Sequence, residues 1–193
     1  MSIVKTNKVR ARKHIVVARA QFVLKKFAQK IKAYKQSMMK IISKQGRAIQ
    51  GVNGDDSNLP YLYTIGNTGA GIPEILVSGS TSKTLANLMN LLSQKMLDSP
   101  EFTQENYQRL LDEVLEERDY CVIIDDEPQR SRIKIKLLDW MKTREEVILS
   151  VDRYGFKTAD VKLIQLVCSD RFNVLPDEPN YDVAGFPQNV YGN

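Results

Sequence analysis

Apolar residues recur every three or four positions near the start of the chain, which predicts one long amphipathic helix. This apolar stripe consists of Val16, Ala20, Val23, Phe27, Ile31, Tyr34, Met38 and Ile41. The spacing places the eight side chains on one helix face for about seven turns. Residues 8–45 contain neither glycine nor proline, and Gly46 is suited to end the helix with a left-handed C-cap.

Shorter apolar runs follow beyond residue 60 and predict strands alternating irregularly with helices. We expect strands at 61–66, 74–78, 120–124, 132–137 and 161–168, and helices from Ser80–Ser82 to Leu97 and from Thr103 to Glu117. The 132–137 run alternates strictly, which predicts a half-buried strand with a basic outer face. Residues 51–60 are rich in turn formers and indicate a linker, whereas 140–154 is ambiguous and favours helix.

The fold class predicted from these elements is α+β, with a mixed or mostly antiparallel sheet, flanking helices and a long basic N-terminal helix. From Ser169 onward the composition is typical of a loop, and we expect this tail to cover a sheet edge or a cleft. No apolar run approaches the ~18 residues of a membrane span, so no membrane-spanning helix is expected.

Charge is divided unevenly along the 193 residues. Residues 1–50 contain 14 Lys and Arg and no acid, a charge of +14, whereas residues 51–193 contain the other 14 and all 23 acids, a charge of −9. The net charge of +5 therefore conceals two parts. We predict a basic helical extension over 1–50 and an acidic α+β domain over 51–193.

The basic side chains of the extension predict a binding surface for a polyanion, most readily nucleic acid. The predicted nucleic-acid-binding residues are Arg12, Lys13, Arg19, Lys25, Lys26, Lys30, Lys32, Lys35 and Lys40. Like charges four residues apart, such as Lys26 and Lys30, repel on a helix and favour an outside anion. The sequence contains no helix-turn-helix, zinc-finger or RNA-recognition motif, so we expect a non-enzymatic binding or regulatory protein with little sequence specificity.

Three other roles for the helix stay open. The apolar stripe packs on the chain's own acidic body, or the helix lies on an anionic membrane surface, or the stripe pairs with a partner protein or a second copy of the chain. The last role describes a host-factor inhibitor or a self-associating subunit. Its partner-binding residues would be Val23, Phe27, Ile31, Tyr34 and Met38.

Candidate catalytic and metal-binding residues are few. Cys121 and Cys168 lie far apart in apolar runs with no CxxC pair, which favours reduced core thiols in a cytoplasmic protein over a zinc site or a disulfide. His14 is the only histidine and lies in a basic stretch. We therefore expect no catalytic residue, no metal and no cofactor.

A weaker alternative is a small-ligand binder or hydrolase with a pocket at Tyr63, Thr64, Gly66, Glu74 and Asp170, in which the two carboxylates share one cleft. The neighbouring loop with Gly66, Gly69 and Gly71 lacks the spacing of a phosphate-binding loop, so a mobile hairpin is expected there.

Three segments resemble a known family. Tyr63-Thr-Ile-Gly66, then Pro73-Glu-Ile-Leu-Val-Ser-Gly79, and later Leu163-Ile-Gln-Leu-Val167 with Asp170 and Pro176-Asp-Glu-Pro179, are similar to domain-of-unknown-function family 4262 of bacteria and their phages. The resemblance covers about residues 55–182, implies a bacterial or phage-encoded protein and supplies no reaction. Members commonly carry a histidine before the Pro-Glu step, where this chain has Ile72. An activity that used that histidine is expected to be absent here.

Overall fold

The computed structural model describes residues 3–99, 101–118, 120–124, 127–147, 150, 153 and 161–191, with the side chains of these residues from Leu24 onward except those of 121–124 and 128. Contacts divide the chain into two units, Met1–Ile41 and Ile42–Asn193. Among the described residues, no helix combines the length and the apolar character that crossing a membrane requires.

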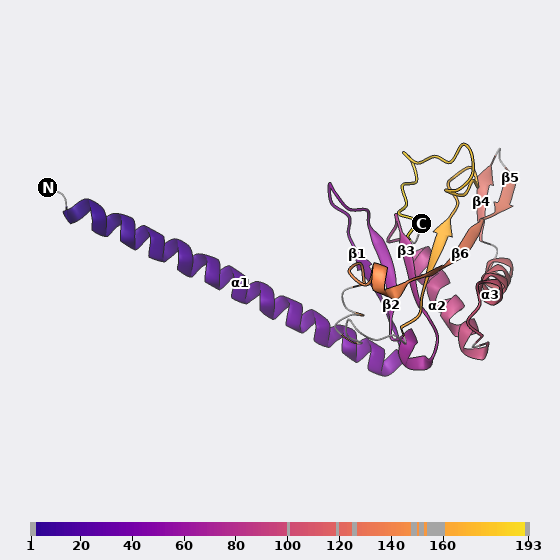
Figure 1. The fold of residues 1–193 in the computed structure, drawn as a ribbon, viewed down its shortest axis with the longest axis horizontal. Helices are drawn as coiled ribbons and strands as arrows, with labels where there is room; N and C mark the ends of the chain where they lie inside the picture. Colours follow the sequence, from indigo (N-terminus) through magenta and orange to yellow (C-terminus); the bar gives the residue numbers. More distant parts are fainter. Residues whose placement is uncertain are drawn as a thin grey trace. The chain divides into compact units, whose positions relative to one another are not determined.

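Helix α1 (Ile3–Gln45) confirms the predicted N-terminal helix (Figure 1). Its end is also as predicted, because Gly46 adopts a φ of 78° and its N–H donates to the Ile42 carbonyl at 2.8 Å. Lys44 lies in the last turn, where a cation interacts favourably with the helix dipole.

A mixed five-stranded sheet with the order β1-β2-β3-β7-β6 forms the centre of the second unit (Figure 1). Its strands are β1 (Ala48–Val52), β2 (Tyr61–Ile65), β3 (Glu74–Ser78), β6 (Ile133–Leu138) and β7 (Leu163–Cys168). Only β3 and β7 pair in parallel among these strands, and the other neighbours are antiparallel. The predicted α+β class and mixed sheet are therefore confirmed.

Strands β3 and β7 are buried on both faces. All five residues of β3 and residues 163–167 of β7 are buried, which explains why both segments are nearly continuous apolar runs. Their register pairs Glu74 with Leu163 and Leu76 with Gln165.

Strand β1 was not predicted, because its residues fell partly in the basic extension and partly in the expected linker. It pairs with β2 from Ala48↔Ile65 to Val52↔Tyr61. Gln50 and Gly51 have weak intrinsic strand preference, so pairing with β2 rather than local propensity decides their conformation.

Helices α2 (Lys83–Asp98) and α3 (Gln104–Glu117) begin where expected. The Ser82 hydroxyl accepts the Leu85 N–H, and the Thr103 hydroxyl accepts the Asn106 N–H, each at 3.1 Å. Both helices pack on the sheet, and the main hydrophobic core lies between the helices and the strands. Its residues include Leu62, Ile75, Val77, Leu88, Leu92, Leu111, Ile135 and Ile164.

Two predicted elements differ from expectation. Strand β4 (Cys121–Ile124) pairs with β5 (Glu127–Arg130) in a separate two-stranded ribbon rather than joining the central sheet. The expected helix over 140–154 is described only as the short helix α4 (Trp140–Thr143), and most of the remaining segment lies outside the described residues.

Residues 188–191 of the C-terminal tail lie beside β7, an inner strand between β3 and β6, so this part of the tail does not cover a sheet edge. The Gln188 side chain accepts the Cys168 N–H at 3.0 Å and donates to the Cys168 carbonyl at 2.6 Å. In the opposite direction, the Gln165 side chain of β7 donates to the Asn189 carbonyl and accepts the Tyr191 N–H. The side-chain amides of Gln165 and Gln188 thus hold the tail against β7 and satisfy backbone groups of both segments.

Asp170 organises the turn between β7 and the tail. One carboxylate oxygen accepts the N–H groups of Phe172 and Val174, and the other accepts the Asp182 N–H at 2.8 Å. Burial raises the pKa of Asp170, but the three N–H donors outweigh burial and hold it below the ordinary value for aspartate.

Two ion pairs connect the same segment to β6 and the residue before it. Arg132 donates to both oxygens of Glu178, at 2.7 and 2.6 Å, and Lys134 contacts Asp177 at 2.7 Å. The Arg132 guanidinium lowers the pKa of Glu178 to about 2, and Lys134 lowers that of Asp177.

The stability supplied by Glu178 should depend on pH. Its folded pKa is depressed, so its contribution is present above the ordinary glutamate pKa of about 4 and is lost as pH falls toward about 2. We expect Glu178→Gln to lower the free energy of unfolding at neutral pH and to match the unmodified protein near pH 2. Urea denaturation followed by circular dichroism at several pH values measures this. Glu101→Gln, at an exposed carboxylate, should change nothing, and a deficit of Glu178→Gln that is constant with pH would contradict the argument.

Candidate functional site

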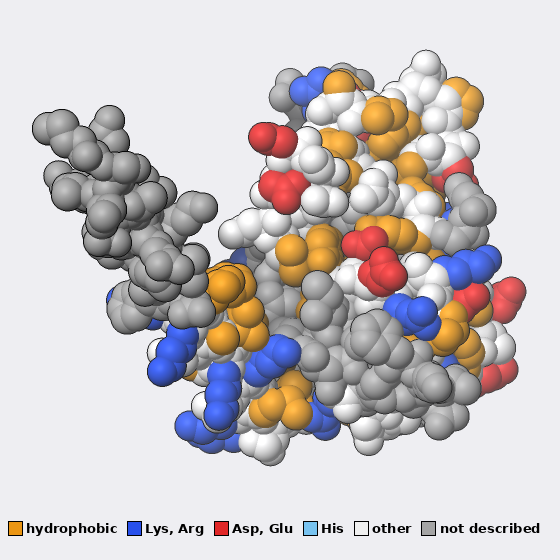
Figure 2. All heavy atoms as spheres, turned by 60° about the vertical axis from the view of Figure 1, so that its left-hand side comes forward, with side chains coloured by type: hydrophobic (Ala, Val, Ile, Leu, Met, Phe, Trp, Pro, Cys, Tyr) orange, Lys and Arg blue, Asp and Glu red, His pale blue; other side chains and the backbone are white. Residues whose placement is uncertain are grey.

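The described part of α1 presents lysines and no acid. The lysines are Lys25, Lys26, Lys30, Lys32, Lys35, Lys40 and Lys44, all exposed except the half-buried Lys35. Figure 2 shows basic side chains gathered on the described part of this helix, where each of them is a lysine. Arg12, Lys13 and Arg19 belong to the same helix, but their side chains lie outside the described residues.

The predicted partner-binding stripe is largely exposed. Phe27 is 62% exposed, Tyr34 46% and Ile31 39%, whereas Met38 is buried and the Val23 side chain lies outside the described residues. Leu24, which the prediction omitted, is 66% exposed. It precedes Phe27 by three residues, and a 3-4-3 spacing from Leu24 to Tyr34 was visible in the sequence.

Glu74, predicted as a pocket residue, is instead a fully buried anchor for a loop. Its carboxylate accepts the Thr64 hydroxyl at 2.7 Å and the N–H groups of Gly66 and Thr68 at 3.0 Å each. The field of Glu74 also raises the pKa of Arg47, although burial outweighs it and leaves that pKa lowered. Backbone and hydroxyl donors thus stabilise the buried charge.

The glycine-rich loop, expected to be mobile, is held in place by these bonds. It forms a short 3-10 turn, η1 (Asn67–Ala70), and the Asn67 amide donates to the Pro73 carbonyl and the Ser93 hydroxyl at 2.9 Å each. Gly66 has a φ of 119°, and a Cβ there would lie 2.5 Å from the Gly46 carbonyl oxygen. Only glycine permits this approach.

The structure does not bring Asp170 to Glu74. Glu74 pairs with Leu163 at the start of β7, and Asp170 follows the far end of that strand. At about 3.3 Å per residue, the two carboxylates lie on the order of 20 Å apart. Tyr63, Thr64 and Gly66 do lie near Glu74, but Tyr63 is buried and stacked on Tyr61. The predicted residues therefore do not form one cleft.

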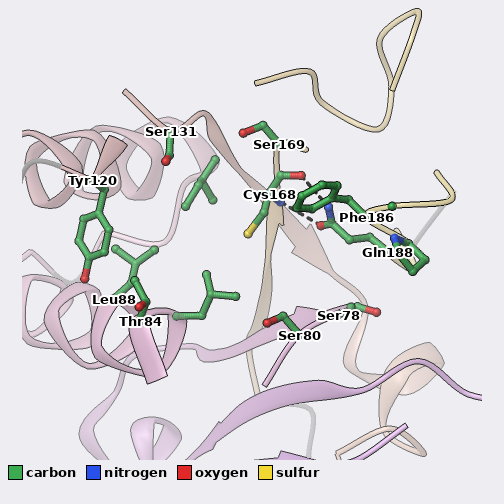
Figure 3. A pocket seen from close by; sticks show the side chains of 15 residues that line it. Ser78, Ser80, Thr84, Leu88, Tyr120, Ser131, Cys168, Ser169, Phe186 and Gln188 are labelled. Carbon is green, nitrogen blue, oxygen red and sulfur yellow. Dashed lines mark hydrogen bonds between the residues drawn. The ribbon is translucent and has the colours of Figure 1, made fainter. Parts of the chain in front are cut away.

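A cavity of about 380 Å³ lies instead at the opposite end of the sheet (Figure 3). Ser78 at the end of β3 and Cys168 at the end of β7 both line it, together with residues from α2 and the tail. None of these residues was predicted. The available signal was the hydroxyl-rich run 78–82 between a strand and a helix, because cavities form beyond the carboxyl ends of adjacent parallel strands. Recognising it required knowing that β3 and β7 are neighbours.

Together, the fold and these surfaces define a mixed α+β domain preceded by a basic helix. The family model described as Domain of unknown function (DUF4262) matches residues 41–182, so the chain belongs to that family, as its resemblance indicated. The match begins 14 residues earlier than the expected residue 55, and thus includes β1. A search of curated proteins and of solved structures found no match.

Ile72 occupies the position at which the resemblance places a histidine. Its side chain is buried in the main hydrophobic core. This position therefore contributes packing in this chain.

Replacing Glu74 should destabilise the domain. In Glu74→Gln an NH₂ group replaces one of the two carboxylate oxygens. In one orientation it would face the N–H groups of Gly66 and Thr68, which are donors themselves. In the other it would face the Thr64 hydroxyl, which already accepts the Ile75 N–H. We expect a loss of about 2 kcal/mol in the free energy of unfolding, measured by urea denaturation. Glu145→Gln, at an exposed carboxylate, is the control, and equal stability of both variants would show that Glu74 does not anchor the loop.

Proposed function

We propose that this protein is a non-enzymatic binding protein whose helix α1 binds a polyanion, most readily nucleic acid. One observation carries the proposal: 14 Lys and Arg and no acid occur in residues 1–50, and the described lysines of that segment lie on a continuous helix. Cytoplasm, of a bacterium or of a phage's host, is the compartment that this proposal implies.

The helix has the length and chemistry for phosphate contacts. At 1.5 Å per residue, 43 residues extend about 65 Å, the length of about 19 base pairs at 3.4 Å each. Lys25, Lys30 and Lys32 make no ion pair within the described part of the chain. Each lysine that neutralises a phosphate releases condensed counterions, which supplies affinity at low salt.

Sequence specificity should be weak. A lysine ammonium is a compact point charge that contacts phosphate without reading base edges. The described part of α1 contains no arginine or asparagine, and Gln29, Gln36 and Gln45 are its only exposed side chains with an amide that can read a base edge.

The proposal predicts binding to duplex DNA that weakens steeply with salt and depends on α1. Fluorescence anisotropy with a labelled duplex of about 24 base pairs, between about 50 and 200 mM salt, measures it. Lys25→Ala/Lys30→Ala/Lys32→Ala should reduce the slope of log affinity against log salt by about 2 to 3, because each phosphate contact contributes roughly 0.9.

The matched control is Lys83→Ala/Arg118→Ala/Lys142→Ala, which removes the same charge from exposed positions of the second unit. It should leave the slope nearly unchanged. Equal effects of the two triple variants would mean that net charge alone, and not α1, determines binding. A salt-independent affinity would exclude phosphate contacts altogether.

A second candidate is pairing of the apolar stripe with another copy of the chain. It is favoured by the exposure of Leu24, Phe27, Ile31 and Tyr34, which repeat at coiled-coil spacing. Lys30 and Lys35 flank this seam, so like charges would oppose a symmetric pair at low salt.

This candidate predicts a different pattern of mutational effects. Phe27→Asp/Ile31→Asp should convert a dimer into a monomer, because a carboxylate cannot be buried in the seam without a partner. Multi-angle light scattering after size-exclusion chromatography measures the mass. Met141→Asp/Val183→Asp, at exposed apolar positions of the second unit, is the control. A monomeric unmodified protein at high salt would eliminate the candidate.

A further inference from the structure

The cavity at the carboxyl ends of β3 and β7 lies within the second unit, to which all of its described lining residues belong. Its volume of about 380 Å³ falls within the ~300–1,000 Å³ of small-molecule sites. The parallel register brings the ends of both strands together, and α2 begins beside them. In Figure 3, Tyr120, Leu88 and Thr84 form one wall, and Cys168, Phe186 and Gln188 face them.

The tail wall of this cavity is fixed by the fold. Gly79 has a φ of 87°, and a Cβ there would lie 2.2 Å from the Pro187 carbonyl oxygen, so the tail packs directly on backbone. Gln188 bonds both backbone groups of Cys168, and the Asn189 N–H donates to the Ser78 hydroxyl at 3.1 Å. The cavity is therefore preformed, which lowers the ordering cost of binding.

The lining selects an uncharged ligand. No charged side chain is among the described residues that line the cavity, and Leu85, Leu88 and Ile133 supply apolar walls. A charge placed there would lose hydration without gaining a partner. Burial raises the pKa of the Cys168 thiol to about 12, so it stays neutral and is no nucleophile at physiological pH.

Hydroxyl groups supply the polar contacts. Tyr120, Thr84 and Ser131 line the cavity, and their hydroxyls make no hydrogen bond within the described residues. Burial raises the pKa of Tyr120, which keeps its phenol protonated and able to donate. A ligand carbonyl or hydroxyl would satisfy these groups.

We propose that this cavity binds a small, uncharged, mostly apolar or aromatic molecule that carries a carbonyl or hydroxyl group. The apolar part packs on Leu85, Leu88 and Ile133, and the oxygen accepts a hydrogen bond from Tyr120. This inference is independent of the proposed function of α1.

The test uses the full chain and prodan, an uncharged naphthyl ketone whose fluorescence shifts to shorter wavelength in an apolar site. The unmodified protein should give a saturable shift with one site per chain. Thr84→Trp fills the cavity from the first turn of α2 and should weaken binding at least tenfold. Asn87→Trp, on the same helix but outside the lining, should bind as the unmodified protein does.

Tyr120→Phe removes only the hydroxyl and keeps the wall, so it tests the site even if Thr84→Trp fails to fold by circular dichroism. We expect it to weaken binding roughly three- to tenfold, the value of one hydrogen bond. The proposal is overturned by an unsaturable signal from the unmodified protein, by equal affinities of the two tryptophan variants when both are folded, or by unchanged affinity of Tyr120→Phe.

Discussion

The parallel contact between β3 and β7 is the constraint on which the second unit depends. It places β3, which is buried throughout, and β7, which is buried over residues 163–167, at the centre of the sheet. The chain between them must therefore cross over through α2, α3 and β6. Because the two strands are parallel, their last residues, Ser78 and Cys168, lie at the same end of the sheet. The start of α2, the tail and the cavity all meet there. Glu74 lies at the start of β3, at the opposite end of that strand. Its carboxylate accepts hydrogen bonds from Thr64 and Gly66 and so fixes the loop that connects β2 to β3.

The two units differ in whether they contain carboxylates that can pair with their basic side chains. In the second unit, several basic side chains have carboxylate partners within the same unit, as with Arg132 and Glu178 or Lys134 and Asp177. Lys95 contacts two carboxylates of α3. Helix α1 contains no acid at all, so repulsion among its own lysines cannot be relieved within the helix. This contrast supports our proposal that α1 binds an external anion.

Much of the fold could be predicted from local patterns. The apolar period identified α1, Ser82 and Thr103 marked the starts of two helices, and the buried strands were recognised by unbroken apolar runs. Strand β1 was missed because Gln50 and Gly51 owe their conformation to β2. The placement of β4 was missed because local sequence does not state which partner a strand selects. Pairing between distant segments is the information that periodicity lacks.

The candidate sites show the same division. The lysines of α1 follow from composition and spacing, which are local properties. The predicted cleft between Glu74 and Asp170 does not form, because Glu74 lies at the start of the parallel pair β3 and β7 and Asp170 follows its far end. The cavity residues Ser78, Tyr120 and Phe186 come from three separate segments, and only the tertiary fold brings them together.

The most direct test of the central claim is a titration of the isotopically labelled full chain with duplex DNA, followed by backbone amide NMR spectra. The account predicts that signals of residues within α1 shift or broaden as DNA is added, and that signals of β1 to β7 keep their positions. Perturbations confined to the α/β domain, or spectra that do not respond to DNA at low salt, would contradict it.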